Sequence, residues 1–224
     1  MSGSIRLGLF GGTFDPIHVG HLDAAAAARA ALALDEVLFV PSHVPPHRAA
    51  DPHATPFHRF AMVALATAGE TAYGASDIEL RRSGASYTYE TLAALHAAGW
   101  RPAQLFFIIG ADAFAEIAQW RQMGRVVEGT NLAVVGRKGT SLQSALDRAP
   151  SLRSRLRPID TAREPSAHTG VYLIEAATRN VSSTTIRTAL QAGRSIADLV
   201  PDVVERHIIR HGLYGAVARL HGNT

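Results

Sequence analysis

The chain has 224 residues, of which 47% are hydrophobic and 18% are charged, and this composition predicts a globular protein with a sizeable core rather than a disordered chain. It contains no cysteine, which excludes disulfides, thiolate metal sites and a cysteine nucleophile. The formal net charge of +3 is too small to indicate a nucleic-acid partner. The sequence has no apolar run of about 18 residues, so no membrane span is predicted. Residues 1–4 lack the order of a signal peptide, and cytoplasm is therefore the expected location.

Short apolar runs alternate with helical patterns along the chain. The runs that favour strands are Ile5–Phe10, Glu36–Val40, Ala75–Leu80, Leu105–Ile109, Asn131–Val135 and Val171–Glu175. The segments that favour helices are His21–Leu34, Phe57–Ala68, Thr88–Ala98, Ser141–Ala149, Ser182–Gln191 and Pro201–His211. Two further segments, Pro41–Pro56 and Ala149–His168, are expected to be loops, and the second is open to being a flexible insert.

Strands that alternate with helices predict a Rossmann-like, doubly wound α/β fold, in which helices cover both faces of a parallel sheet. We expect a single domain, with an α/β core over about residues 5–181 and a small C-terminal helical subdomain over about residues 182–214. In such sheets, ligands bind beyond the carboxyl ends of the strands. The polar clusters that follow the expected strands are Gly11–His21, Pro41–Arg48, Gly110–Asp112, Gly136–Lys138 and Asn180–Arg187. These clusters are therefore expected at one edge of the sheet.

Two histidines, His18 and His21, follow Gly11-Gly12 at the start of an expected helix. Glycines let backbone N–H groups approach a ligand, and a helix N-terminus favours a phosphate. Imidazoles three residues apart can share a helix face and add hydrogen-bond donors. A single histidine in this position is usually a cap or a surface residue, and a His-x-x-His pair can also ligate zinc, although no third ligand is evident. The glycine spacing matches neither the dinucleotide-binding fingerprint nor the phosphate-binding loop of nucleoside triphosphatases.

A second candidate anion site is Ser182-Ser183-Thr184-Thr185-Ile186-Arg187, which follows the last expected strand. Its hydroxyl groups can cap a helix and can also bind phosphate oxygens. Arg187, one turn into the helix, can reach the same anion with two parallel donors. A run of hydroxyl residues before a helix is a common cap, so the position of this segment carries more weight than its composition.

The segment Gly11-Gly12-Thr13-Phe14-Asp15-Pro16-x-His18-x-Gly20-His21 resembles the HxGH signature of the nucleotidyltransferase superfamily, and Ser182–Arg187 resembles the second motif of that superfamily, with Val181 in place of its leading isoleucine. Within the superfamily, the chain is similar to bacterial nicotinate mononucleotide adenylyltransferases over about residues 5–214. The supporting segments are Pro41–Arg48, Ser86–Leu92, Phe107–Ala113, Trp120 and Gly212–Tyr214. The narrower resemblance depends on the Tyr87-Thr88 and Gly110–Asp112 segments.

The resemblance implies transfer of AMP from ATP to nicotinate mononucleotide, giving nicotinate adenine dinucleotide and pyrophosphate. It implies catalytic roles for His18, His21 and Arg187. The residues implied to bind ATP are Gly11, Gly12, Thr13, Phe14, His18, His21, Gly110, Asp112, Ser183, Thr184 and Arg187. The residues implied to bind the mononucleotide are His47, Arg48, Thr88, Trp120 and Arg137. Mg²⁺ is expected to be held through the ATP phosphates and not by protein ligands.

Two of these roles have competing interpretations. Arg48 stands where the family often has lysine, and the two cations differ in geometry. Trp120 lies between Gln119 and Arg121, and a tryptophan in such a setting is more often a packed residue than a ligand contact.

Other functions stay open on the sequence alone. A related nucleotidyltransferase acting on nicotinamide mononucleotide, pantetheine phosphate or another phosphate ester would share both motifs. A nucleotide-binding regulator without catalysis is the alternative from another class, and the presence of both histidines and Arg187 counts against it. A nucleic-acid-binding module is disfavoured because basic and aromatic residues do not interleave. The sequence leaves the oligomeric state undecided, a homo-oligomer included.

Overall fold

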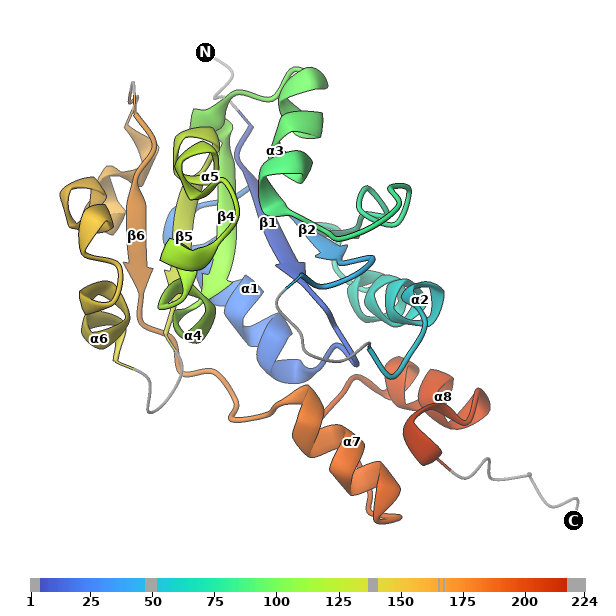
Figure 1. Ribbon diagram of the computed structural model, residues 1–224. Coiled ribbons are helices and arrows are strands. Elements are labelled where there is room, and N and C mark those ends of the chain that lie inside the picture. Colours follow the sequence, from blue (N-terminus) through green and yellow to red (C-terminus); the bar gives the residue numbers. More distant parts are fainter. Residues whose placement is uncertain (1–4, 47–51, 137–140, 165, 167, 217–224) are drawn as a thin grey trace, which may run out of the picture.

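The computed structural model describes residues 5–46, 52–136, 141–164, 166 and 168–216. Its centre is a six-stranded sheet, in which all paired strands are parallel and the order is β3-β2-β1-β4-β5-β6. The strands are β1 (Leu7–Gly12), β2 (Glu36–Pro41), β3 (Tyr73–Ala75), β4 (Leu105–Gly110), β5 (Asn131–Val135) and β6 (Val171–Ile174). The predicted parallel α/β sheet is confirmed (Figure 1).

Helices connect successive strands and continue after the last one. They are α1 (Val19–Leu32), α2 (Pro56–Thr67), α3 (Thr88–Ala97), α4 (Ala111–Phe114), α5 (Met123–Gly129), α6 (Leu142–Asp147), α7 (Ser183–Gln191) and α8 (Asp202–Arg210). Short 3₁₀ helices lie at Pro102–Gln104, Ile117–Gln119, Pro150–Arg155, Ile159–Arg163 and Leu213–Gly215. Within the described residues, none of the helices has the length and apolar character needed to cross a membrane.

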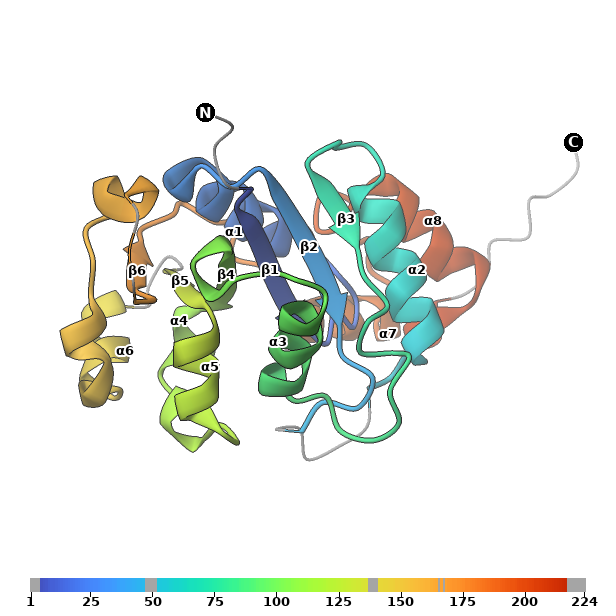
Figure 2. The ribbon, with the colours of Figure 1, turned by 90° about the horizontal axis from the view of Figure 1, so that it is seen from above.

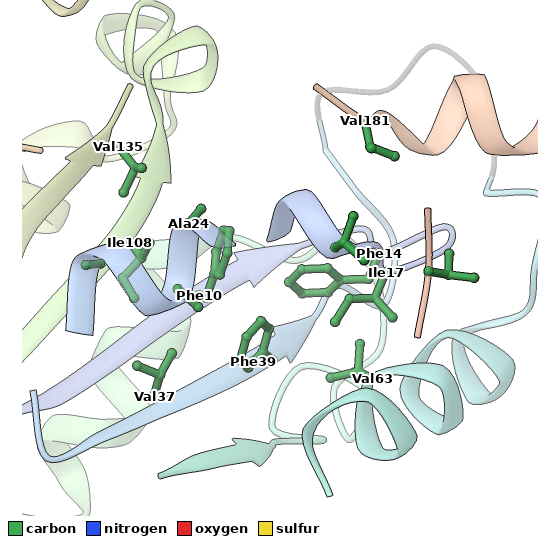
Figure 3. Packing of buried hydrophobic residues seen from close by; sticks show 14 of the residues in the cluster. Phe10, Phe14, Ile17, Ala24, Val37, Phe39, Val63, Ile108, Val135 and Val181 are labelled. Atoms are coloured by element: carbon green, nitrogen blue, oxygen red, sulfur yellow. The ribbon is translucent and has the colours of Figure 1, made fainter. Parts of the chain in front are cut away.

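The strands bury side chains on both faces, as a sheet with two helical layers requires. In β4, Phe106 and Ile108 join a cluster with residues of α1, α2, α7 and α8, whereas the alternate residues Leu105, Phe107 and Ile109 join a cluster with α3, α4, α5 and α6. Seen from above, α1 and α8 lie on one side of the sheet and α3 and α5 on the other (Figure 2). The first cluster packs α1 against the sheet through Phe10, Phe39 and Ile108 (Figure 3).

The helices α7 and α8 contribute to the same core as the sheet. Ile186 of α7 and Val204 and Ile208 of α8 are fully buried in the cluster that contains Phe10 and Phe39. These helices therefore share a hydrophobic core with the α/β part of the chain. The separate helical subdomain predicted from about residue 182 stays a prediction.

The third strand differs from the prediction. The strand expected at Ala75–Leu80 is wrong, because β3 ends at Ala75 and the chain then turns. The backbone carbonyl of Asp77 accepts hydrogen bonds from the N–H groups of Leu80 (2.8 Å) and Arg81 (3.1 Å), and the Ser76 hydroxyl accepts one from Ile78 (3.4 Å). Serine and aspartate favour such turns locally, and here that preference outweighs the alternating apolar pattern.

The segment expected as a loop or flexible insert, Ala149–His168, is also more ordered than predicted. Its described residues form the 3₁₀ helices Pro150–Arg155 and Ile159–Arg163, separated by a bridge from Leu156 to Val171. Leu152 is 2% exposed and Ala162 is 8% exposed, one in each of the two core clusters. Apolar burial on both faces of the sheet explains why the segment is structured despite its arginines and prolines.

Candidate functional site

The site lies where the strand order reverses. The chain passes from β1 outward to β2 and β3, then returns to β4 on the other side of β1 and continues outward to β5 and β6. At such a switch point the connections after the two central strands diverge, which leaves a crevice beyond their carboxyl ends. Gly11 and Gly12 end β1, and Gly110 ends β4. Both therefore border the position where the fold favours a ligand.

A cavity of about 270 Å³ opens beside the end of β1. Its lining residues are Gly11, Gly12, Thr13, Ser42, Pro45, Pro46, Glu79, Ser86, Tyr87, Thr88, Phe107, Ala113, Trp120 and Arg121. Trp120 packs edge-on against Phe107, with ring centroids 5.9 Å apart, so its indole is both a core contact and part of the wall. The cavity brings the glycine-rich end of β1 together with Thr88 and Trp120, which are far apart in the sequence.

The two glycines at the end of β1 make room for aromatic rings. A Cβ on Gly11 would lie 3.1 Å from the ring of Phe107, and one on Gly12 would lie 3.0 Å from the ring of Phe14. Phe14 is 2% exposed and has a positive φ of 49°, so its side chain turns back into the core. The structure thus places the Phe14 ring away from the cavity, and a role in ATP binding could involve only its backbone.

His18 and His21 lie at the start of α1 with their rings stacked. His18 is the N-cap residue and is 2% exposed, and the ring centroids are 3.6 Å apart at an interplanar angle of 22°. The backbone N–H of His18 donates to Nδ1 of His21 at 3.2 Å. Because Nδ1 accepts this bond, the proton of the neutral His21 ring is assigned to Nε2. His21 is therefore held in the tautomer that can donate through Nε2.

Gly20 allows this arrangement of the two rings. A Cβ at this position would lie 3.0 Å from the carbonyl oxygen of Arg179 and 3.2 Å from Nδ1 of His18. The start of α1 thus approaches the backbone that precedes α7 closely. Any larger residue would have to displace either that backbone or the His18 ring.

The second motif contacts the first one. Arg187 Nη1 donates to the carbonyl oxygen of Asp15 at 2.8 Å and its Nη2 donates to Thr184 Oγ1 at 3.2 Å, while the Ser183 hydroxyl donates to the carbonyl oxygen of Pro16 at 2.9 Å. Ser182 caps α7 by accepting from the N–H of Thr185 at 3.1 Å. The predicted phosphate-binding residues of the two motifs are therefore adjacent.

Asp15 is a fully buried carboxylate at the centre of this contact. It accepts hydrogen bonds from the backbone N–H groups of His53 (2.9 Å) and Ala54 (3.0 Å) and from the Tyr214 hydroxyl (2.9 Å). Burial acts to raise the pKa of Asp15, but these three donors and the nearby charge of Arg187 outweigh it and lower the pKa below the ordinary 3.8. The same burial, together with the negative charge of Asp15, raises the pKa of Tyr214. Asp15 thus stays ionised and Tyr214 neutral over the physiological range.

Arg59, on α2, is also completely buried and binds backbone. Its guanidinium donates to the carbonyl oxygens of Thr13 (2.7 Å), His43 (3.0 Å) and Ala54 (3.2 Å). It therefore joins the loop after β1 to the segment after β2 and to the start of α2. Sequence reasoning missed Arg59, since nothing in its local pattern separates it from a solvated arginine of an amphipathic helix.

The predicted site residues are only partly gathered in the cavity. Gly11, Gly12, Thr13, Thr88 and Trp120 line it, whereas His18, His21, Arg187, Asp112, Ser183 and Thr184 do not. Gly110 is the N-cap residue of α4, and Asp112 is an exposed residue of its first turn, next to the lining residue Ala113. The predicted mononucleotide-binding residues His47, Arg48 and Arg137 lie outside the described residues.

Sequence reasoning also missed Glu79, which lines the cavity and is 8% exposed. Glu79 falls within the expected strand Ala75–Leu80, where a single charged residue gives no reason to suspect a site. In the part of the chain that the structure describes, no group of three or more His, Cys, Asp or Glu side chains is placed to hold a metal ion.

The chain was compared with known proteins. The family model of cytidylyltransferase-like proteins matches residues 9–189. A probable nicotinate-nucleotide adenylyltransferase of Roseiflexus sp. (strain RS-1) is 38% identical over 213 residues, covering 94% of this chain and 98% of that protein. Another, from Symbiobacterium thermophilum, is 40% identical over 211 residues, covering 93% of this chain and 95% of that protein.

Among solved structures, the chain resembles the Plasmodium falciparum nicotinic acid mononucleotide adenylyltransferase complexed with NaAD. The TM-score is 0.69 at 17% identity, with 94% of this chain and 98% of that chain covered. At this identity the likeness concerns the fold. The sequence identity to the bacterial relatives extends over nearly the full length of both partners. On that ground, the chain belongs to the family of nicotinate-nucleotide adenylyltransferases, within the cytidylyltransferase-like group.

Proposed function

We propose that the protein transfers AMP from ATP to nicotinate mononucleotide, forming nicotinate adenine dinucleotide and releasing pyrophosphate. The observation that carries the proposal is the cavity in which Gly11–Thr13, from the HxGH segment, share a wall with Thr88 and Trp120. It supports a site where a phosphate-bearing group and an aromatic ring are bound side by side. The family membership of the chain supports the choice of substrates.

The reaction needs alignment of two anions more than it needs a base. An oxygen of the mononucleotide 5′-phosphate attacks the α-phosphorus of ATP, the new phosphorus–oxygen bond forms, and the bond to the β-phosphate oxygen breaks. A phosphate monoester has a second pKa near 6, so the attacking group is largely ionised at neutral pH. The protein then contributes by positioning both substrates and by stabilising the charge on the phosphate oxygens.

His18, His21 and Arg187 are the residues that we assign to this stabilisation. They lie at the N-terminus of α1 and on the adjoining α7, where the helix dipole of α1 also favours an anion. The bond from His18 N–H to His21 Nδ1 supports the role of His21 as a donor through Nε2. Gly110, Asp112, Ser183 and Thr184 are proposed to contact ATP from the neighbouring strand ends.

The pyridine ring is assigned to the cavity, against the Trp120 indole and beside the Thr88 hydroxyl. A volume of about 270 Å³ lies just below the range of about 300–1,000 Å³ typical of ligand sites, which suits the ring-bearing half of the product and not the whole dinucleotide. ATP is proposed to be bound as its Mg²⁺ complex, with the ion on the triphosphate.

Product analysis tests the function. The purified protein is incubated with Mg²⁺ and ATP plus nicotinate mononucleotide, nicotinamide mononucleotide or pantetheine phosphate, and both the coupled product and pyrophosphate are quantified. We expect the highest kcat/KM with nicotinate mononucleotide. A preference for pantetheine phosphate would reassign the protein to a related transferase. Binding of ATP without pyrophosphate release with any acceptor would indicate a regulator.

A further inference from the structure

Three segments meet in one wall of the cavity. They are the segment after β2, which contributes Ser42, the turn 77–82, which contributes Glu79, and the segment Ser86–Thr88 at the start of α3. The first and third segments pair directly, since the Ser86 N–H donates to the carbonyl oxygen of Val44 at 2.8 Å and the His43 N–H donates to the Ser86 hydroxyl at 2.8 Å. The wall is therefore built mainly from short irregular segments, and only Thr88 belongs to a helix, α3.

Glu79 joins this assembly to α3. Its Oε1 accepts a hydrogen bond from the Thr91 hydroxyl at 2.6 Å, and Arg82 Nη2 donates to the same hydroxyl oxygen at 2.6 Å while lying 3.8 Å from Glu79 Oε1. Burial raises the pKa of Glu79, and the hydrogen bonds from Thr91 and Ser86 and the charge of Arg82 oppose the rise. The carboxyl group is thus hydrogen-bonded to Thr91, which lies on α3 three residues after the wall segment Ser86–Thr88.

A buried carboxyl group costs free energy unless its hydrogen bonds are satisfied. An apolar side chain would fill the same space at lower cost but would leave the Thr91 hydroxyl without its acceptor. Tyr87 and Thr88, which precede Thr91 by about one turn, border the cavity. What Glu79 provides is a fixed position for this part of the cavity lining.

We propose that Glu79 is a positioning residue that holds the Ser86–Thr88 wall in place for the pyridine mononucleotide. The proposal rests on the proposed function for the identity of the ligand. Glu79 acts through Thr91, and its loss weakens binding of the mononucleotide while leaving unaffected the ATP contacts that we assign to α1, α4 and α7.

Thr91→Val tests the proposal, because it removes the hydroxyl that binds Glu79 and preserves the side-chain volume. We expect the KM for nicotinate mononucleotide to rise about tenfold, the effect of losing one hydrogen bond to a charged group, while the KM for ATP stays within about twofold. Thr91→Ser restores the hydroxyl and is expected to recover most of the wild-type KM. Thr67→Val is the matched control, since Thr67 is a buried helical threonine whose hydroxyl donates to the Val63 carbonyl of its own helix, α2.

Amide hydrogen exchange of the free protein supplies a measurement that does not depend on activity. In Thr91→Val, we expect faster exchange of the His43 and Ser86 amides, which bond across the wall, and no such change in Thr67→Val. Unchanged exchange, or an equal rise in KM for both substrates, would overturn the proposal. If the wild type makes no dinucleotide, the proposed function fails, and the exchange data still decide whether Glu79 holds the wall.

Discussion

At the residue scale, several polar side chains of the site bind the backbone of the loop after β1. Arg187 and Ser183 donate to the carbonyls of Asp15 and Pro16, and the His18 amide fixes the tautomer of His21. Residues that the sequence predicts to contact phosphate therefore also stabilise the conformation of the loop after β1. A substitution in either motif combines a loss of ligand contact with a loss of loop geometry, and the measurement has to separate the two.

His21→Ala is expected to lower kcat by about 10²–10³-fold, comparable to the loss of one oxyanion donor, because His21 is assigned to donate to the phosphate oxygens through Nε2. Steady-state kinetics with both substrates saturating measures the change, and circular dichroism verifies that the variant is folded. His168→Ala, which alters an exposed histidine in another loop, serves as the control. Turnover near the wild-type value in folded His21→Ala would remove His21 from the catalytic role.

The sequence was sufficient to bring His18, His21 and Arg187 into one neighbourhood, because each follows a strand and the strand ends of a parallel sheet meet at one edge. It was not sufficient for Asp15, Arg59 or Glu79. Their partners are backbone groups and hydroxyls elsewhere in the chain. The loop contacts of Asp15 are made with residues that lie 38 or more positions away in the sequence, and Arg59 binds Thr13, which lies 46 positions away. Such pairings depend on the final packing and leave no local pattern.

At the scale of elements, five of the six strands and all the longer helices begin and end within a few residues of the predicted bounds. Hydrophobic runs and helix caps determine them, and both are local signals. The third strand was misplaced because the apolar residues Ile78 and Leu80 alternate with polar ones in a segment whose backbone forms a turn. Local hydrogen bonds of Ser76 and Asp77 determine the structure there, and the periodicity of apolar residues carries no information about them.

A matched pair of substitutions tests the close approach of α1 to the backbone before α7. Gly20 and Gly124 are each the second residue of a helix, α1 and α5. A Cβ on Gly20 meets the Arg179 carbonyl at 3.0 Å, whereas one on Gly124 meets nothing within 4 Å. We expect Gly124→Ala to stabilise the protein by about 0.5–1 kcal/mol and Gly20→Ala to destabilise it by about 1–3 kcal/mol. Urea denaturation measures both values, and a stabilising Gly20→Ala would show that the helix start has room to move.

At the scale of the whole molecule, a segment early in the chain and a segment late in the chain meet at Asp15. The Tyr214 hydroxyl donates to Asp15 across 199 residues of sequence, and Val19 of α1 donates its N–H to the carbonyl oxygen of Leu199, just before α8. The parallel sheet supplies the frame, while the segments after β6 close over the loop that follows β1. The stability of the first motif is thus coupled to the packing of the last helix.

Asp15→Asn tests this coupling through its pH dependence. The pKa of Asp15 is lowered in the folded protein. Its contribution to the free energy of unfolding is therefore fully present above the unfolded value of 3.8 and is lost as pH falls through the lower folded value. We expect the variant to be less stable than the wild type by about 3 kcal/mol at pH 7, with the gap narrowing below pH 4.

Urea denaturation at a series of pH values from 7 to 3 measures this gap. Tyr214→Phe is the companion variant, which removes one hydrogen bond and leaves the charge of Asp15, so its smaller deficit of about 1 kcal/mol is expected to be present at neutral pH. A deficit in Asp15→Asn that does not change with pH would show that the carboxylate is not ionised when buried.

The bond between Tyr214 and Asp15 has a consequence for truncated forms of the chain. A chain cut off before Tyr214 would keep its sheet residues but would lack one of the three hydrogen-bond donors that hold the Asp15 carboxylate. Truncation late in the sequence is therefore expected to loosen the histidine-bearing loop, which lies almost 200 residues earlier.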